Sequence, residues 1–156
     1  MLNILVLSNT NATAGQMAHG FIDYFTNDRA HIYSAGSKPI SIHKKAIETM
    51  EFVGIDISSQ ESNHIDDYSS KNFHYIINIK THPQEIPEKF KKKAKVIDFN
   101  ISETEELSID SNDTEFVTAR NKIQSFCEQF IETELKELEK IKAIKKAKKK
   151  AKNKKA

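Results

Sequence analysis

The sequence predicts an α/β protein, with a four-stranded parallel sheet and helices on both of its faces. Short apolar segments rich in β-branched residues alternate along the chain with segments whose apolar residues recur at helical spacing. Residues 2–7 are apolar at almost every position, as in a strand whose two faces are both buried. Such alternation implies βαβ crossovers and a three-layer arrangement, in which ligands bind at the carboxyl ends of the strands.

The first half of the chain contributes two strands and two helices to this prediction. Strands are expected at 2–7 and 31–34, and a first helix at 15–26. A second helix is expected around Ala46, Ile47 and Met50, and Gly54 is expected to end it.

The second half contributes two more strands and a long final helix. We expect strands at 73–79 and 94–98, a polar helix at 84–92 and an acidic loop at 100–113. The last helix begins near Thr114, and its apolar stripe faces the core: Phe116, Ala119, Ile123, Phe126, Cys127, Phe130 and Ile131.

Charge divides the chain into one domain, residues 1–138, and a lysine-rich tail, residues 139–156. From Lys140 onward there are 10 lysines and no acid, which leaves 14 of the 24 basic groups and all 22 acidic groups in the rest. The tail is expected to be a frayed helix or disordered, because it has no apolar stripe and its charges repel. It would bind nucleic-acid phosphates or an anionic membrane surface through Lys140 to Lys155, or simply remain solvated.

Composition excludes several classes of protein. No apolar run approaches membrane-spanning length, and the start of the chain shows no export signal. Cys127 is the sole cysteine, so no internal disulfide is possible, and its place on an apolar stripe indicates a buried structural thiol. The six histidines show no metal-ligand spacing. We therefore expect a cytoplasmic protein with no metal and no cofactor.

The segment that connects the first strand to the first helix is the candidate ligand site. It runs from Ser8 through Asn9, Thr10, Asn11, Ala12, Thr13 and Ala14 to Gly15. Its position at the end of a parallel strand is where such folds bind ligands, and backbone N–H groups at a helix start attract anions.

Four stretches of the chain share the motifs of a known family. They are the strand-loop-helix with Asn11 and Gly20-Phe21; Tyr33-Ser34-Ala35-Gly36; Gly54-Ile55-Asp56-Ile57-Ser58; and Phe73 to Ile79 with Asp98-Phe99 beyond. Through them residues 1–135 resemble the low-molecular-weight tyrosine phosphatases and, among these, the thioredoxin-coupled arsenate reductases. The resemblance implies the flavodoxin-like form of the predicted sandwich.

The resemblance also implies which positions carry the family's chemistry. Its nucleophilic cysteine falls on Ser8, whose hydroxyl needs a neighbouring base that Asn9 and Thr10 do not supply. Its anion-clamping arginine falls on Ala14. The leaving-group acid falls on Ile101, and the two further cysteines of the reductases fall on Lys80 and Ile86.

These replacements predict a catalytically inactive homologue, a pseudoenzyme with a binding or regulatory role. Its partner would be a phosphate-like anion or another protein. Two alternatives stay open at this point. One is residual phosphatase or arsenate reductase-like activity through a modified anion-binding loop; the other is non-specific nucleic-acid binding through the tail.

Overall fold

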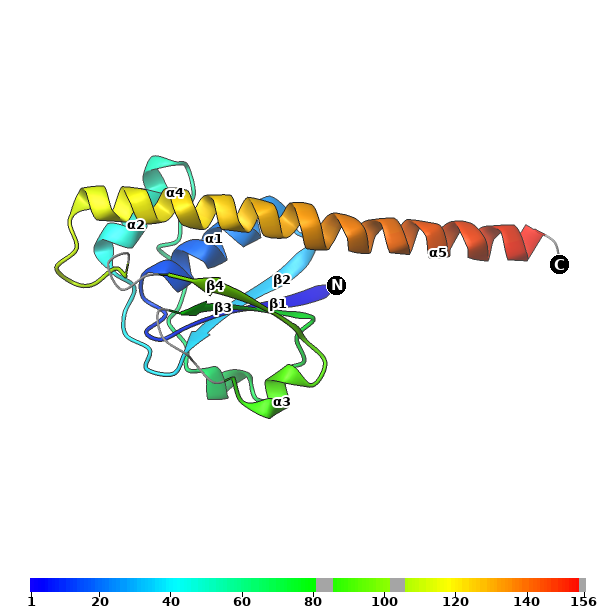
Figure 1. Cartoon of the computed structure of the whole chain (residues 1–156), viewed down its shortest axis with the longest axis horizontal. Coiled ribbons are helices and arrows are strands. Elements are labelled where there is room, and N and C mark those ends of the chain that lie inside the picture. The colour runs from blue at the N-terminus through cyan, green and yellow to red at the C-terminus, as the bar shows by residue number, and fades with distance from the viewer. Residues whose placement is uncertain (81–85, 102–105, 155–156) are drawn as a thin grey trace.

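Four parallel strands form a single sheet in the order β2-β1-β3-β4 (Figure 1). They are β1 (Leu2–Ser8), β2 (Ala30–Gly36), β3 (Tyr75–Lys80) and β4 (Lys95–Asn100). The structure is a computed structural model, and it describes residues 1–80, 86–101 and 106–154. The predicted parallel α/β fold is confirmed, and each strand ends within two residues of its predicted bounds.

Helices cover both faces of this sheet (Figure 1). On one face lie α1 (Ala14–Thr26), α2 (Lys44–Phe52) and α4 (Asp113–Phe130); on the other lie α3 (Glu88–Lys91) and the 3-10 turn η1 (Ile65–Tyr68). Gly54 ends α2 with a φ of 83°, as its stop role requires. Of the polar helix predicted at 84–92, residues 88–91 are helical, and residues 84–85 lie outside the described part, as do 102–105 of the predicted loop.

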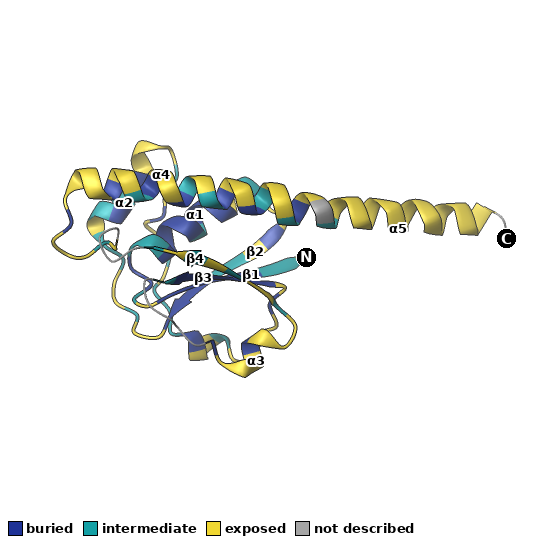
Figure 2. Ribbon diagram, in the orientation of Figure 1, coloured by how far each residue is buried: buried dark blue, intermediate teal, exposed yellow. Residues whose placement is uncertain are grey.

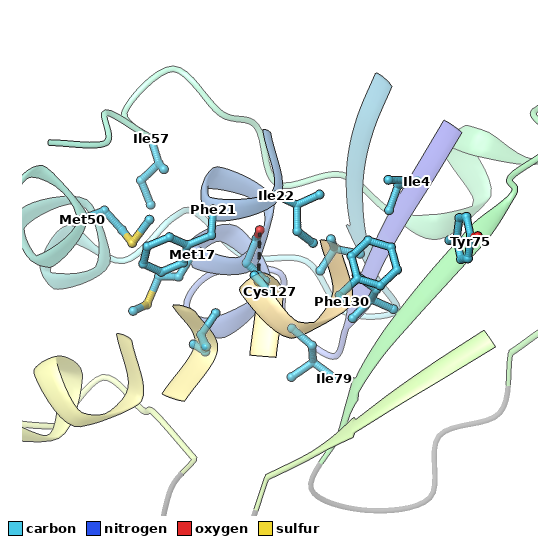
Figure 3. Packing of buried hydrophobic residues seen from close by; sticks show 14 of the residues in the cluster. Ile4, Met17, Phe21, Ile22, Met50, Ile57, Tyr75, Ile79, Cys127 and Phe130 are labelled. Carbon is cyan, nitrogen blue, oxygen red and sulfur yellow. Dashed lines mark hydrogen bonds between the residues drawn. The ribbon is translucent and has the colours of Figure 1, made fainter. Parts of the chain in front are cut away.

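The core has two parts because successive residues of a strand point to opposite faces. Ile4 and Val6 of β1 join α1 and α4 in the larger cluster, which includes Phe21 and Phe130 (Figure 3). Leu5 and Leu7 pack in the smaller cluster on the other face, together with Phe73 and Phe90. The predicted stripe of α4 is buried as expected, with Phe116, Ile123, Cys127 and Phe130 at most 3% exposed.

The long final helix leaves the body of the protein. α4 continues through a π-helical segment, η3 (Ile131–Leu135), into α5 (Lys136–Lys154), and the three form one rod (Figure 1). Burial ends at Leu135, and α5 is exposed along nearly its whole length (Figure 2). The tail thus has helical backbone to Lys154, and its expected fraying in solution stays a prediction. No helix in the described ranges is long and apolar enough to cross a membrane.

Candidate functional site

The loop between Ser8 and Gly15 lies at the carboxyl edge of the sheet. β1, which ends at Ser8, is a central strand, paired with β2 on one side and β3 on the other. α1 begins at Ala14, so the loop opens directly onto a helix N-terminus. The fold therefore puts the predicted segment where parallel α/β proteins bind ligands.

The carbonyl groups of loop residues 9–13 all accept hydrogen bonds from the surrounding chain. Four of the donors are backbone N–H groups, those of Lys38, Ile40, His43 and Met17. The other two are side chains, those of Ser62 and Gln16. The donor-to-acceptor distances are 2.8 to 3.3 Å. The loop's own N–H groups differ: within the described residues, none from Asn9 to Gly15 donates a hydrogen bond. A run of unpaired N–H groups at a helix start is a ready anion-binding arrangement.

Ser8 lies at the base of this loop with an unpaired hydroxyl. The residue is 8% exposed, and its Oγ has no hydrogen-bond partner among the described residues. Asn11, with a φ of 50°, is fully buried, and both polar atoms of its side chain are likewise unpaired there. The loop thus holds buried polar groups whose hydrogen-bonding capacity is unused.

A pocket of about 460 Å³ opens beside the loop. Six of the eight predicted loop residues line it: Ser8, Asn9, Thr10, Thr13, Ala14 and Gly15. Asn11 and Ala12 do not, because both are buried in the protein interior, at 0% and 2% exposure. The rest of the apolar lining is Ile79, Phe99, Ile101, Leu107, Ala119 and Ile123. The sequence analysis did not predict most of this apolar lining. Two signals could have indicated it: the apolar residues at the ends of the third and fourth strands, and the apolar stripe of the last helix.

The other positions singled out by the resemblance do not all meet at the pocket. Ile101 and Lys80 line it, and Nζ of Lys80 lies 3.3 Å from Oδ2 of Asp98. Ile86 is 5% exposed and belongs to the core on the opposite face of the sheet, beside Phe90. The geometry therefore brings Ser8, Ala14, Lys80 and Ile101 together and leaves Ile86 apart.

Cys127 lies outside the pocket, on the buried side of α4. It is 0% exposed, and its Sγ contacts the backbone oxygen of Ala18 at 3.9 Å (Figure 3). Burial raises the pKa of this thiol far above its ordinary value, which suppresses the reactive thiolate. The predicted burial of Cys127 is confirmed.

A family model described as low molecular weight phosphotyrosine protein phosphatase matches residues 3–150. The chain belongs to this family. Curated relatives include an arsenate reductase of Staphylococcus aureus (strain Newman), 36% identical over 76 residues, which are 49% of this chain and 58% of the relative. Another is an arsenate reductase of Shouchella clausii, 38% identical over 72 residues, 45% of this chain and 52% of the relative. The chain therefore matches between half and three fifths of the length of these relatives.

Solved structures of the phosphatase family show the same fold. An arsenate reductase in the phosphate-binding state has a TM-score of 0.75 at 24% identity, covering 84% of this chain and 97% of the reductase. The low-molecular-weight protein tyrosine phosphatase of T. tengcongensis has a TM-score of 0.67 at 16% identity, covering 85% and 99%. At this identity the likeness is one of fold, and the activity of the present chain has to be argued from its own site.

Proposed function

We propose that this protein is a non-catalytic member of the phosphatase family that binds a small oxyanion at the loop of residues 8–15 and acts through that binding, as a sensor or regulator. The observation that carries the proposal is the hydroxyl of Ser8. Its oxygen has no hydrogen-bond partner among the described residues, so no base there is placed to take its proton. A serine hydroxyl is a weak nucleophile without such a base.

The position implied for the clamping arginine supports the same conclusion. Ala14 lines the pocket with a methyl group, so it supplies neither a positive charge nor a planar pair of donors. Lys80 is the lysine at the end of β3, and the Asp98 carboxylate already neutralises it. Lys122 also lines the pocket, but so do Glu106 and Glu115, so the described lining has no excess of positive charge to stabilise the charge that develops during phosphoryl transfer.

Anion binding needs much less than catalysis. The unpaired N–H groups of residues 9–15 and the start of α1 supply donors and a partial positive charge. Since an exposed helix end contributes only about 0.3 to 1 kcal/mol, binding of free phosphate should be weak.

A turnover assay tests the loss of catalysis. The protein should release no nitrophenol from nitrophenyl phosphate and should not reduce arsenate with thioredoxin, above the level of Ser8→Ala. Activity that Ser8→Ala abolishes would instead support the alternative, a residual enzyme that uses Ser8. The variant is a matched control because Ser8 Oγ makes no hydrogen bond whose removal would disturb the fold.

Amide NMR tests the binding. Inorganic phosphate should shift the N–H resonances of residues 9–15, while those of Asn72 and His74, at the opposite edge of the sheet, stay in place. Gly15→Ala should weaken these shifts, because a methyl group there would meet Ser8 Oγ at 2.3 Å and deform the loop. Unchanged loop resonances at molar excess of phosphate would contradict the proposal.

A second candidate function rests on α5. This exposed helix carries ten lysines and, after Glu139, no acid. Its bulky apolar residues beyond Leu138 are only Ile141 and Ile144, which is little for a helix that inserts into a membrane surface. Lysines spread around the helix instead suit the phosphates of a nucleic-acid duplex, without sequence preference.

Fluorescence anisotropy with a mixed-sequence DNA duplex tests this second candidate. Replacing Lys148, Lys149 and Lys150 by Gln should lower the affinity for DNA. The slope of the logarithm of the binding constant against the logarithm of the salt concentration should become shallower by about 0.9 for each phosphate that the variant no longer neutralises. The matched control replaces Lys91, Lys92 and Lys93 by Gln, the other run of three lysines, and should bind like the parent. Equal effects of the two triple variants, or binding only to phosphatidylserine vesicles, would contradict this candidate.

A further inference from the structure

The pocket beside the loop is apolar beyond its polar end. Its walls come from Ile79 and Phe99, the next-to-last residues of β3 and β4, and from Ala119 and Ile123 on α4. The ring of Phe99 stacks on Phe126 with ring centroids 4.3 Å apart, which fixes this wall in place. A pocket of about 460 Å³ with such walls suits the apolar body of a small organic molecule better than an inorganic ion alone.

The polar end of the same pocket requires an acceptor. The loop residues that line the pocket are Ser8, Asn9, Thr10, Thr13, Ala14 and Gly15. The N–H groups of residues 9, 10 and 13–15 and the hydroxyl of the buried Ser8 are donors with no partner in the described chain. A purely apolar ligand would leave them unsatisfied, at the cost of their desolvation. The ligand therefore carries an oxygen-bearing head at this end.

The charges of the described lining disfavour a doubly negative head. Among the described residues, two lysines and two glutamates line the pocket: Lys80, Lys122, Glu106 and Glu115. Lys80 is in addition paired with Asp98. The start of α1 adds a partial positive charge of about half an elementary charge. A doubly charged phosphoryl group would find no matching excess of positive charge in the described lining and would be repelled by Glu106 and Glu115.

We infer that this pocket takes a small apolar monocarboxylate, aromatic or aliphatic, in preference to a doubly charged phosphoryl compound. The inference rests on the proposed function, because it names the ligand class of the same loop. Carboxylate oxygens accept from the loop N–H groups, and the hydrocarbon body lies against Phe99 and Ile123.

Four probes separate the contributions of head and body. They are benzoate, phenyl phosphate (mostly a dianion at pH 7.5), benzyl alcohol and inorganic phosphate, titrated by calorimetry and followed by the N–H resonances of residues 9–15. Benzoate should bind at least fivefold more tightly than each of the other three. Tighter binding of phenyl phosphate than of benzoate would overturn the inference and leave the proposed oxyanion loop intact. Absence of any loop shift with all four would overturn both.

Two substitutions test the assignment to this pocket. Ala119→Phe fills the apolar part and should weaken benzoate at least tenfold, whereas Val117→Phe, on the same helix but outside this pocket, should bind like the parent. Ala14→Arg adds the missing charge and should move the preference toward phenyl phosphate. Benzoate affinity that is equal in the Ala119 and Val117 variants, or a preference that Ala14→Arg leaves unchanged, would overturn the inference.

Discussion

A methyl group on Cα of Gly15 would stand 2.3 Å from Oγ of Ser8. The two residues are therefore in close contact across the loop, with Ser8 at the end of β1 and Gly15 in the first turn of α1. Asn11 Oδ1 would lie 3.1 Å from the same methyl group. The absence of a side chain at residue 15 is what lets the buried polar groups of the loop lie against the helix.

Gly15→Ala should destabilise the protein through this contact. Alanine would gain about 1 kcal/mol of helix propensity, but the clash should cost about 1 to 3 kcal/mol and outweigh it. Ser8→Ala alone should be close to neutral, because its hydroxyl makes no hydrogen bond. In the double variant the nearest remaining atom of residue 8 is Cβ, at 3.2 Å, so much of the clash is relieved. Urea unfolding of the parent, the two single variants and the double variant measures the coupling between residues 8 and 15. Strictly additive changes in the free energy of unfolding would contradict this coupling.

Periodicity predicted the elements well, and it predicted their contacts poorly. The strands and the stripe of α4 follow from local patterns of burial, and the loop's place follows from the strand-to-helix order. The π-helical segment η3 has no such signal, because Ile131 to Leu135 read as ordinary helix. Nor does any pattern reveal that Phe99 and Ile123 share a pocket, since that depends on how the sheet and α4 pack together.

Which backbone groups of the loop form hydrogen bonds could not be predicted from the sequence either. The resemblance indicated Ser8 to Gly15 as the site. In the folded chain, donors distant in sequence, such as Lys38 and His43, occupy the loop's carbonyl groups, while its N–H groups are free in the described structure. This arrangement depends on the path of the chain after β2. A sequence pattern locates an anion-binding loop, and only the fold shows which of its groups remain available.

Stability should decline in mild acid because of His19. Its Nδ1 lies 2.7 Å from Ser34 Oγ, and burial lowers its pKa from 6.5 to about 4. Between these values the unfolded chain binds a proton that the folded chain does not, so the free energy of unfolding falls as pH falls from 6.5 toward 4, by at most about 1.4 kcal/mol per pH unit from this group.

Urea unfolding across that pH range measures the effect of His19. His19→Gln should flatten the dependence, since glutamine does not titrate. His31→Gln removes an exposed ring instead and should keep the slope of the parent. A slope that survives His19→Gln unchanged would show that other groups cause it.

The thiol of Cys127 should be unreactive in the native protein. It is fully buried, and burial raises its pKa, so the thiolate that reacts with disulfide reagents is scarce and shielded. Dithionitrobenzoate at pH 8 should release no thionitrobenzoate from the folded protein and one equivalent in urea. The matched control is Val117→Cys in a Cys127→Ala background, which moves the thiol to a site on α4 that is 39% exposed and should react rapidly. Fast labelling of the native parent would show that α4 opens readily.

The folded body should end at Leu135, and the lysine helix beyond it should add little stability. Leu135 is 4% exposed in the main core, whereas Ile141 and Ile144 are 43% and 55% exposed. Beyond Leu135, the ion pair of Arg29 with Glu139 ties α5 to the body, and an exposed pair of this kind contributes at most about 1 kcal/mol.

Truncation after Lys140 keeps that pair and should leave the free energy of unfolding within about 0.5 kcal/mol of the parent. Leu135→Ala in the full chain should instead cost about 2 to 5 kcal/mol. Thermal and urea unfolding compare the two, and a truncated chain that loses as much stability as Leu135→Ala would mean that α5 packs on the body in solution.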